Sequence, residues 1–291
     1  MSVFTEVWTG ELVKQLRANM DGTFLQGISD QSAIANNNVI HLVDVGVDPE
    51  VLVNNSTYPI KTQELSDGDV AISLDKFQTV ATPVTDDELH AASYDKIARA
   101  REAHANAIND SKFSKAIHAL APAKEATKTP CIATTGTADG ARKRITLADI
   151  IALKKRFDQQ KVPTAGRRLV LCPDHVNDLL MTEQRFAEQY YNYTDGKIAN
   201  LYGFEVYEFA VCPMFTTAGV KGAIGSTTGN QASVAFYAPS VFVATGDTTM
   251  YYSEAKTDPL HQRNLINFRH YFIAMPKRQE AIGAIYSAAQ A

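Results

Sequence analysis

The residues whose types and spacing could perform chemistry lie in the segment Cys172-Pro173-Asp174-His175. A thiol, a carboxylate and an imidazole at a strand-to-helix turn could form a nucleophilic site in which the histidine deprotonates the cysteine. However, Cys172 ends an apolar run, and Pro173 removes one amide donor from any oxyanion hole. We therefore expect Cys172 to be a small buried side chain, Asp174 to lie in the first turn of a helix, and His175 to lie on the surface. A cytoplasmic α/β enzyme that uses Cys172 and His175 is the less favoured alternative.

The other groups that could bind a metal or a cofactor lack the required spacing. The three cysteines are far apart with no CxxC pair, and the seven histidines form no HxxxH or HxH pattern, so neither zinc nor a disulfide framework is expected. The glycine-rich segment 219–229 lacks the spacing of a phosphate loop and of a dinucleotide fingerprint. We expect it to be a mobile surface loop. The sequence thus predicts no catalytic, cofactor-binding or metal-binding residue.

Length and composition indicate a folded protein. The chain has 291 residues, of which 45% are hydrophobic and 21% charged, which is enough for a substantial core. No apolar run approaches the roughly 18 residues that a membrane-spanning helix needs. The first residues lack the basic start and apolar stretch of a secretory signal. We therefore expect no membrane partner, and cysteines without a pairing pattern fit a reducing cytoplasm.

The distribution of charge is uneven along the chain. Residues 1–90 carry 4 Lys+Arg against 14 Asp+Glu, whereas residues 96–168 carry 16 Lys+Arg against 6 Asp+Glu. These segments are either solvated faces of unlike composition, or the acidic part of one copy docks on the basic part of another. A nucleic-acid enzyme is less favoured because aromatic residues do not alternate with the basic ones.

The first half of the chain predicts an arm, a hairpin and a long helix. Residues 1–38 show no sustained periodicity, so we expect an extended arm that a neighbour holds in place. Residues 39–83 have β character, and Asp67-Gly68 is a hairpin turn signal. This hairpin is poor in large aliphatic residues, so it is expected to project and to pack on a partner. The stretch 85–120 contains no Gly or Pro and starts with the capping-box pattern Thr85–Glu88.

The second half predicts a compact α/β unit followed by strands. Residues 121–144 are loop-like, and Thr146 can cap the helix that follows. Leu169–Leu171 reads as a buried strand, and Pro173 fits the first turn of the next helix. An Asp195-Gly196 turn leads to a further strand around Phe204–Phe209. From residue 233 onward the pattern indicates strands, many of them with aromatic side chains.

Three segments of the second half carry a recognisable pattern of turns and packing: "LADIIALKKRFDQQKVPTAGRRLVLCPDHVNDLL", "GKIANLYGFEVYEFAVCP" and "NFRHYFIAMPKRQEAIGAI". Together they resemble the major capsid proteins of tailed bacteriophages with the Hong Kong 97-like fold. In this family a helix leads into a VP..GR.LV..P pattern and later into G.I..L.GF.V, and the matching residues here run from Val162 to Pro213. The order of the preceding elements is also similar.

The resemblance implies an α+β fold with an N-terminal arm, an extended E-loop hairpin, a peripheral domain with a long spine helix, and a compact α/β axial domain. The arm would cover 1–38 and the E-loop 39–83. The peripheral domain would combine 84–144, including the spine helix 86–119, with 233–275. The axial domain would combine 145–232 with 276–291.

The resemblance further implies a structural protein, not an enzyme, that self-assembles as hexamers and pentamers into the icosahedral head shell around a double-stranded DNA genome. Its location would be the virion, after assembly in the bacterial cytoplasm, with a portal and scaffolding or decoration proteins as partners. An encapsulin-type nanocompartment shell is the nearer alternative. The charged residues expected to form contacts between copies are Asp67, Asp69, Asp75, Arg99, Arg101, Arg142, Lys143, Arg144, Arg167 and Arg168.

Overall fold

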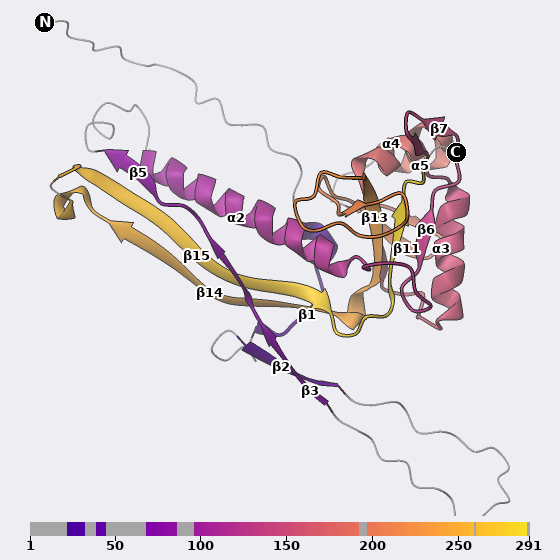
Figure 1. Ribbon diagram of the computed structural model, residues 1–291, viewed down its shortest axis with the longest axis horizontal. Coiled ribbons are helices and arrows are strands. Elements are labelled where there is room, and N and C mark those ends of the chain that lie inside the picture. Colours follow the sequence, from indigo (N-terminus) through magenta and orange to yellow (C-terminus); the bar gives the residue numbers. More distant parts are fainter. Residues whose placement is uncertain are drawn as a thin grey trace, which may run out of the picture.

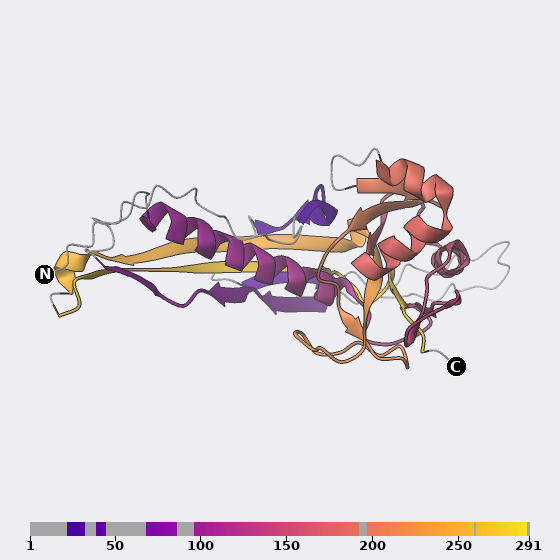
Figure 2. The ribbon, with the colours of Figure 1, turned by 90° about the horizontal axis from the view of Figure 1, so that it is seen from above.

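The computed structural model describes residues 22–32, 39–44, 68–85, 96–191, 197–258 and 260–289. These residues form a compact sheet-and-helix unit and an elongated unit that extends away from it (Figures 1 and 2). The helices are α2 (Lys96–Leu120), α3 (Leu147–Gln159), α4 (Pro173–Thr182) and α5 (Gln184–Tyr191), with the short 3-10 turns η1 (Gly22–Leu25), η3 (Ala238–Ser240) and η4 (Ala255–Thr257).

A seven-stranded sheet organises the compact unit, in the order β10-β11-β9-β13-β16-β6, with β12 paired to β13. The bounds are β6 (Cys131–Ala133), β9 (Arg167–Leu171), β10 (Lys197–Leu201), β11 (Phe204–Glu208), β12 (Met214–Phe215), β13 (Asn230–Tyr237) and β16 (Ile282–Tyr286). The pair β9–β11 is parallel, and β9–β13 and β13–β16 are antiparallel. A small two-stranded ladder, β7 (Ala138–Asp139) with β8 (Arg142–Lys143), lies beside this sheet.

Both faces of the seven-stranded sheet are buried, and alternation along β9 shows how. Leu169 and Leu171 face a core built with α3, α4 and α5, whereas Val170 faces a second core that contains Ile117 of α2. Successive side chains of a strand point to opposite faces, so a strand covered on both sides reads as a continuous apolar run. Helix α3 lies very close to β16, because a Cβ atom on Gly283 would stand 2.9 Å from Leu153 Cδ1.

Strand β13 and the short strand β6 both belong to the seven-stranded sheet, whereas residues 233–237 and 131–133 are predicted to belong to the peripheral domain. The segment 121–144 is also not simply a loop, since it contains β6, β7 and β8. Strand β6 pairs with β16 over a long sequence separation, and no local pattern indicates such a pairing.

The elongated unit is a five-stranded sheet with α2 packed along one face. Its order is β1-β14-β15-β4, with β5 also paired to β15, and its bounds are β1 (Ser29–Asp30), β4 (Asp75–Gln78), β5 (Thr82–Thr85), β14 (Val241–Ser253) and β15 (Arg263–Pro276). Phe268, His270 and Phe272 of β15 face α2: the His104 ring lies 5.7 Å from that of Phe268, and the Phe113 ring 6.4 Å from that of Phe272. Figure 1 shows β14, β15 and α2 running side by side.

A hairpin of β2 (Val39–Asp44) and β3 (Gly68–Ser73) confirms the predicted β structure at 39–44 and 68–73, and residues 45–67 lie outside the described part of the chain. Its turn was placed wrongly, because Gly68 pairs with Asp44 inside the ladder; Asp67 lies outside the described residues. The base of the hairpin also packs on its own subunit, with Ile40 and Leu74 against Phe242. The prediction that it packs only on a partner is therefore wrong for this end.

The described part of the N-terminal arm is likewise held by its own subunit. Phe24 is fully buried, its ring lies 5.2 Å from that of Phe209, and β1 pairs with β14. The expectation that a neighbour holds the arm is wrong for residues 22–32. Residues 1–21 and 33–38 lie outside the described part of the chain.

Local start signals in the compact unit are confirmed. Thr146 and Asp149 form a capping box at α3, and Pro173 occupies the first turn of α4. The helix that starts at Pro173 ends at Thr182, and Glu183 separates α4 from α5. Most of the Thr85–Glu88 box and the Asp195-Gly196 turn lie outside the described residues.

Within the described residues, no helix has the length and apolarity needed to cross a membrane.

Candidate functional site

The Cys172–His175 turn lies at the junction of β9 and α4, inside the compact unit. Both side chains are fully buried, so the prediction that His175 lies on the surface is wrong. His175 Nδ1 lies 2.7 Å from Ser233 Oγ, and His175 Nε2 lies 3.1 Å from Ser287 Oγ. Because β13 and the end of the chain supply these two hydroxyls, the ring is used to join distant segments, which satisfies both of its nitrogens.

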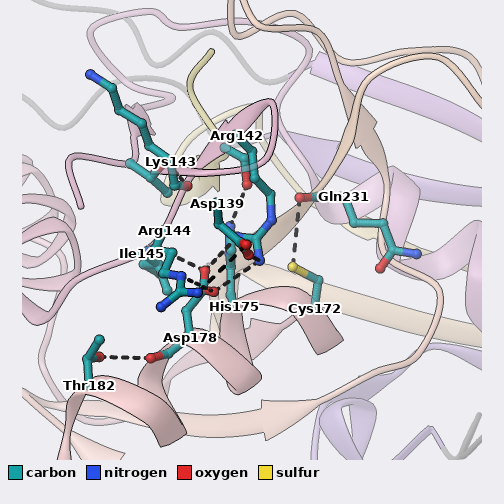
Figure 3. Close-up of polar contacts among 12 residues, drawn as sticks. Asp139, Arg142, Lys143, Arg144, Ile145, Cys172, His175, Asp178, Thr182 and Gln231 are labelled. Atoms are coloured by element: carbon teal, nitrogen blue, oxygen red, sulfur yellow. Dashed lines mark hydrogen bonds and ion pairs between the residues drawn. The ribbon is translucent and has the colours of Figure 1, made fainter. Parts of the chain in front are cut away.

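The electrostatics of this turn exclude nucleophilic chemistry. Burial raises the pKa of the Cys172 thiol to about 12, so the reactive thiolate is absent at neutral pH. The thiol instead donates to the Gln231 carbonyl at 3.7 Å (Figure 3). Within the described residues no group of three potential metal ligands exists either. The buried-thiol interpretation is therefore supported, and the enzyme alternative is not.

The buried imidazole predicts an acid sensitivity of the subunit. Burial lowers the pKa of His175 to about 4, from an ordinary value of 6.5; Asp178 opposes this shift and Arg142 adds to it. Between these two values the unfolded chain binds a proton that the folded chain does not, so stability falls as the pH falls from 6.5 towards 4. At pH 4.5 the expected loss from this residue is about 2–3 kcal/mol relative to pH 7.

Urea unfolding at pH 7 and pH 4.5 would measure this loss. The carboxyl groups also titrate in this range, so the comparison is with His175→Gln, which keeps a polar side chain but does not titrate. The loss on acidification should be smaller in His175→Gln by about 2–3 kcal/mol. Equal losses in the two proteins would contradict the prediction.

A buried ion-pair cluster holds the β7–β8 ladder against α4 (Figure 3). Arg142 Nη1 donates to Asp178 Oδ2 at 2.6 Å and Nη2 to Asp178 Oδ1 at 3.0 Å, while Asp139 accepts a further bond from Nη2 at 2.8 Å. The Ile145 amide also donates to Asp178, at 3.1 Å. The hydrogen bond with Asp178 raises the pKa of Arg142. A two-pronged pair of this kind is strong and directional, so it fixes the ladder on the helix.

Four of the arginines predicted to contact neighbouring copies are engaged within the subunit. Arg142 belongs to the cluster above, and Arg144 Nη2 lies 3.7 Å from Asp139 Oδ1. Arg167 is only 1% exposed; it binds the Pro163 carbonyl at 2.9 Å as well as the Val162 carbonyl, and pairs with Asp158.

Arg168 donates to the Phe24 carbonyl at 2.8 Å and so fixes the N-terminal segment. Arg167 is buried within its own subunit, and the other three arginines are partly exposed. Their role in contacts between copies stays a prediction.

The remaining predicted contact residues differ in their availability. Asp75 pairs with Lys115 of its own subunit at 2.6 Å, and Arg99 pairs with Glu102 at 2.9 Å. Arg101 is exposed on α2, and Figure 3 shows Lys143 directed away from the ion-pair cluster. Asp67 lies outside the described residues, and of Asp69 only the backbone, in β3, is described.

The glycine-rich segment 219–229, expected to be a mobile surface loop, is attached to α2 through Lys221 and Gly222. Lys221 Nζ donates to the carbonyls of His118 at 2.9 Å and Ala121 at 2.6 Å, at the C-terminal end of α2. His118 in turn lies 2.9 Å from the Gly222 carbonyl. A cation on the unpaired carbonyls of a helix C-terminus is favourable. This segment therefore connects the helix of the elongated unit to the compact unit.

Exposed apolar side chains on both faces of the far end of β14 were not identified from the sequence. Met250, Tyr251 and Tyr252 are 44%, 43% and 43% exposed, and Leu260, between η4 and β15, is 87% exposed. On the face opposite α2, the Arg269 guanidinium lies 5.5 Å from the ring centroids of both Tyr251 and Tyr271. The run "TTMYYS" was a usable signal, because β-branched and aromatic residues on a strand normally have a packing partner.

Comparison with known proteins identifies a family and a set of similar folds. A family model described as phage capsid protein matches residues 67–287. A solved structure from Mycobacterium phage Che8 has a TM-score of 0.68 at 18% identity and covers 96% of each chain. The capsid of cyanophage P-SCSP1u has a TM-score of 0.69 at 15% identity and covers 99% of this chain and 94% of its own.

The capsid of Ralstonia phage GP4 has a TM-score of 0.66 at 10% identity and covers 98% of this chain and 95% of its own. No curated protein matches the sequence.

Proposed function

This chain belongs to the phage capsid protein family, and from that premise we propose that its copies form the hexamers and pentamers of an icosahedral shell around double-stranded DNA. It is a structural protein, a component of the virion that builds the head shell, and not an enzyme.

One observation carries the proposal: among the described residues, much of the sheet of the elongated unit has no covering segment. Helix α2 lies on one face, and the base of the β2–β3 hairpin covers the near end of the opposite face, around Phe242 and Ala244. The far end of β14 exposes Met250 and Tyr252 on the α2 side and Tyr251 on the opposite side. Large apolar surfaces at the end of a projecting sheet are expected to be covered by neighbouring copies.

The two units have counterparts in the domains that the resemblance implies. We infer that the seven-stranded sheet with α3, α4 and α5 is the axial domain, which meets its counterparts at the centre of a capsomer. Helix α2 would be the spine helix of the peripheral domain, together with β14 and β15. Residues 39–83 would be the E-loop and residues 1–38 the N-terminal arm.

The remaining partners are inferred from charge and from the family. A net charge of −4 gives no general attraction for phosphate, which suits a shell whose DNA must move during loading. Contacts with the genome would therefore be independent of sequence. A portal is an expected partner, scaffolding or decoration proteins are further candidates, and assembly would take place in the host cytoplasm.

Electron microscopy of the purified protein tests the shell function, since closed particles or rings are expected and a uniformly monomeric protein would contradict it.

In the same experiment, replacing both Asp67 and Asp69 with lysine should lower the yield of particles. Loss of the attraction between the acidic hairpin and a basic neighbour should raise the subunit concentration needed for assembly about tenfold, the equivalent of about 1.4 kcal/mol.

The control is Asp75→Asn, since Asp75 pairs with Lys115 of its own subunit. This variant should assemble almost normally, because exposed ion pairs contribute about 0–1 kcal/mol. Unchanged particle yield in the Asp67→Lys/Asp69→Lys protein, with a normal circular dichroism spectrum, would contradict the role of the hairpin but not that of the shell.

A further inference from the structure

Strand β14 has a free edge over its far half. Its neighbour β1 pairs only with Phe242 and Val243, and the last contact on this side is the Thr245 amide, which donates to Ser32 Oγ at 2.9 Å. Beyond this point no described residue pairs with the outer edge of β14. Figure 1 shows the outer side of β14 open along the arm of the molecule.

The direction of the free backbone groups follows from the neighbouring strand. The Phe268 carbonyl accepts from the Thr79 amide at 3.0 Å, and the Phe268 amide donates to Thr79 Oγ1 at 2.9 Å, on the β4 side, so both groups point away from β14. In an antiparallel ladder the facing residue then points away as well, and that residue is Met250. By the same alternation, Thr248 and Tyr252 direct their amides and carbonyls to the free edge.

The composition of this edge is that of an interface, not of a protected edge. Natural edge strands are blunted by lysine, proline or a covering segment. The stretch Thr248–Ser253 contains neither lysine nor proline and no charge, and it consists of hydroxyl, aromatic and thioether side chains. The irregularity between Thr245 and Thr248 separates this stretch from the part covered by β1.

If β14 pairs with β14 of a second copy, only one symmetric register pairs Thr248, Met250 and Tyr252 of one strand with the same three residues of the other. Centred on Met250, an antiparallel copy places Thr248 opposite Tyr252 and Asp247 opposite Ser253, so no acidic residue faces another. A register centred on Thr248 would push Tyr252 onto Ala244, between residues already bonded to Gln31 and Ser32. A register centred on Tyr252 would face Met250 with Glu254, which lies beyond the end of β14.

We propose that β14 of one subunit pairs antiparallel with β14 of a second copy across a two-fold axis at Met250, which joins their sheets into one. The inference rests on the proposed shell function. Such an interface is self-complementary, as two-fold symmetry requires. Each facing pair exchanges both of its N–H···O bonds. Tyr252 of each copy packs beside Thr248 of the other on the α2 side of the joined sheet.

A cysteine at the axis tests the register. In Met250→Cys particles the two Cα atoms facing each other would be about 5.5 Å apart, within disulfide range. Dibromobimane, which bridges close thiols, should therefore convert most of the protein into covalent dimers on a denaturing gel. The native cysteines Cys131, Cys172 and Cys212 are buried, so wild-type particles should give none.

The matched control is Thr248→Cys, whose equivalents would be about 14 Å apart. It should give no dimer by itself, whereas Thr248→Cys combined with Tyr252→Cys should give dimers again. Particles without dimers in Met250→Cys, or equal dimers in Thr248→Cys, would overturn the pairing and leave the shell function intact. Absence of particles in the wild-type protein would instead refute the shell function, and the pairing with it.

A second variant covers the case in which Met250→Cys fails to assemble. Met250→Glu would bring two carboxylates together at the axis, and its particle yield should fall at least tenfold while Met250→Gln stays close to wild type. Because Met250 is 44% exposed, neither change should unfold the subunit. Normal particle yield from Met250→Glu would also overturn the proposal.

Discussion

Replacing Phe24 with alanine is expected to lower the free energy of unfolding by about 3–5 kcal/mol, the usual cost of removing a fully buried phenylalanine. The ring is 0% exposed and packs in one core with Ile117 of α2 and Val170 and Phe236 of the seven-stranded sheet. It therefore fills the place where the two units meet. Urea unfolding of the purified subunit, followed by circular dichroism, measures the change.

The matched control is Gln26→Ala, two residues away on the same segment, because the Gln26 side chain is exposed. It should change stability by less than about 0.5 kcal/mol. The Phe24→Ala protein should also be cut faster by proteases in residues 22–32, since only the Arg168 bond to the Phe24 carbonyl and the short pairing of β1 with β14 would be left beside the smaller apolar contacts of this segment. Similar urea midpoints for the two variants would show that Phe24 does not join the units.

This role of Phe24 also shows where sequence reasoning stops. The surrounding sequence has no helix or strand periodicity, so residues 22–32 read as an arm in need of a neighbour. The partners that bury Phe24 come from residues 117, 170, 209 and 236. Only the folded chain brings them together, and a single sequence carries no signal of such distant contacts.

Local signals were reliable where the determinants themselves are local. The capping box at Thr146, the proline start at Pro173 and the apolar run Leu169–Leu171 are each decided by residues within one turn or one strand. The same local reasoning gave a wrong prediction for the exposure of His175. Its position shortly after a proline suits an exposed helix start, whereas hydrogen bonds with Ser233 and Ser287 make its burial possible. Burial of a polar group depends on partners that the local sequence does not contain.

Charge was the least predictable property of the candidate contact residues. The excess of basic residues at 96–168 suggested a docking surface, but Arg142 and Arg167 meet carboxylates of the same chain. The free edge of β14 was missed for a related reason. Whether a strand lies at an edge depends on sheet order, and "TTMYYS" would read the same in a central strand.

The largest electrostatic effect is expected at Asp178, where Asp178→Ala should destabilise the subunit by about 3–5 kcal/mol. The carboxylate is 1% exposed and balances Arg142, itself only 12% exposed. Its removal leaves a buried guanidinium and the Ile145 amide without this acceptor, and such losses cost far more than the net value of the intact pair. Urea unfolding again measures the effect.

Two comparisons separate the loss of pairing from the loss of packing. Asp139→Ala removes the other carboxylate on Arg142, but Asp139 is 41% exposed, so it should cost less than about 1 kcal/mol. Arg142→Leu combined with Asp178→Leu removes both charges, and it should be less destabilising than Asp178→Ala alone, because no buried charge remains unpaired. A double variant as unstable as the sum of its single variants would mean that the two residues act independently, and that the β7–β8 ladder is held to α4 by something other than this ion pair.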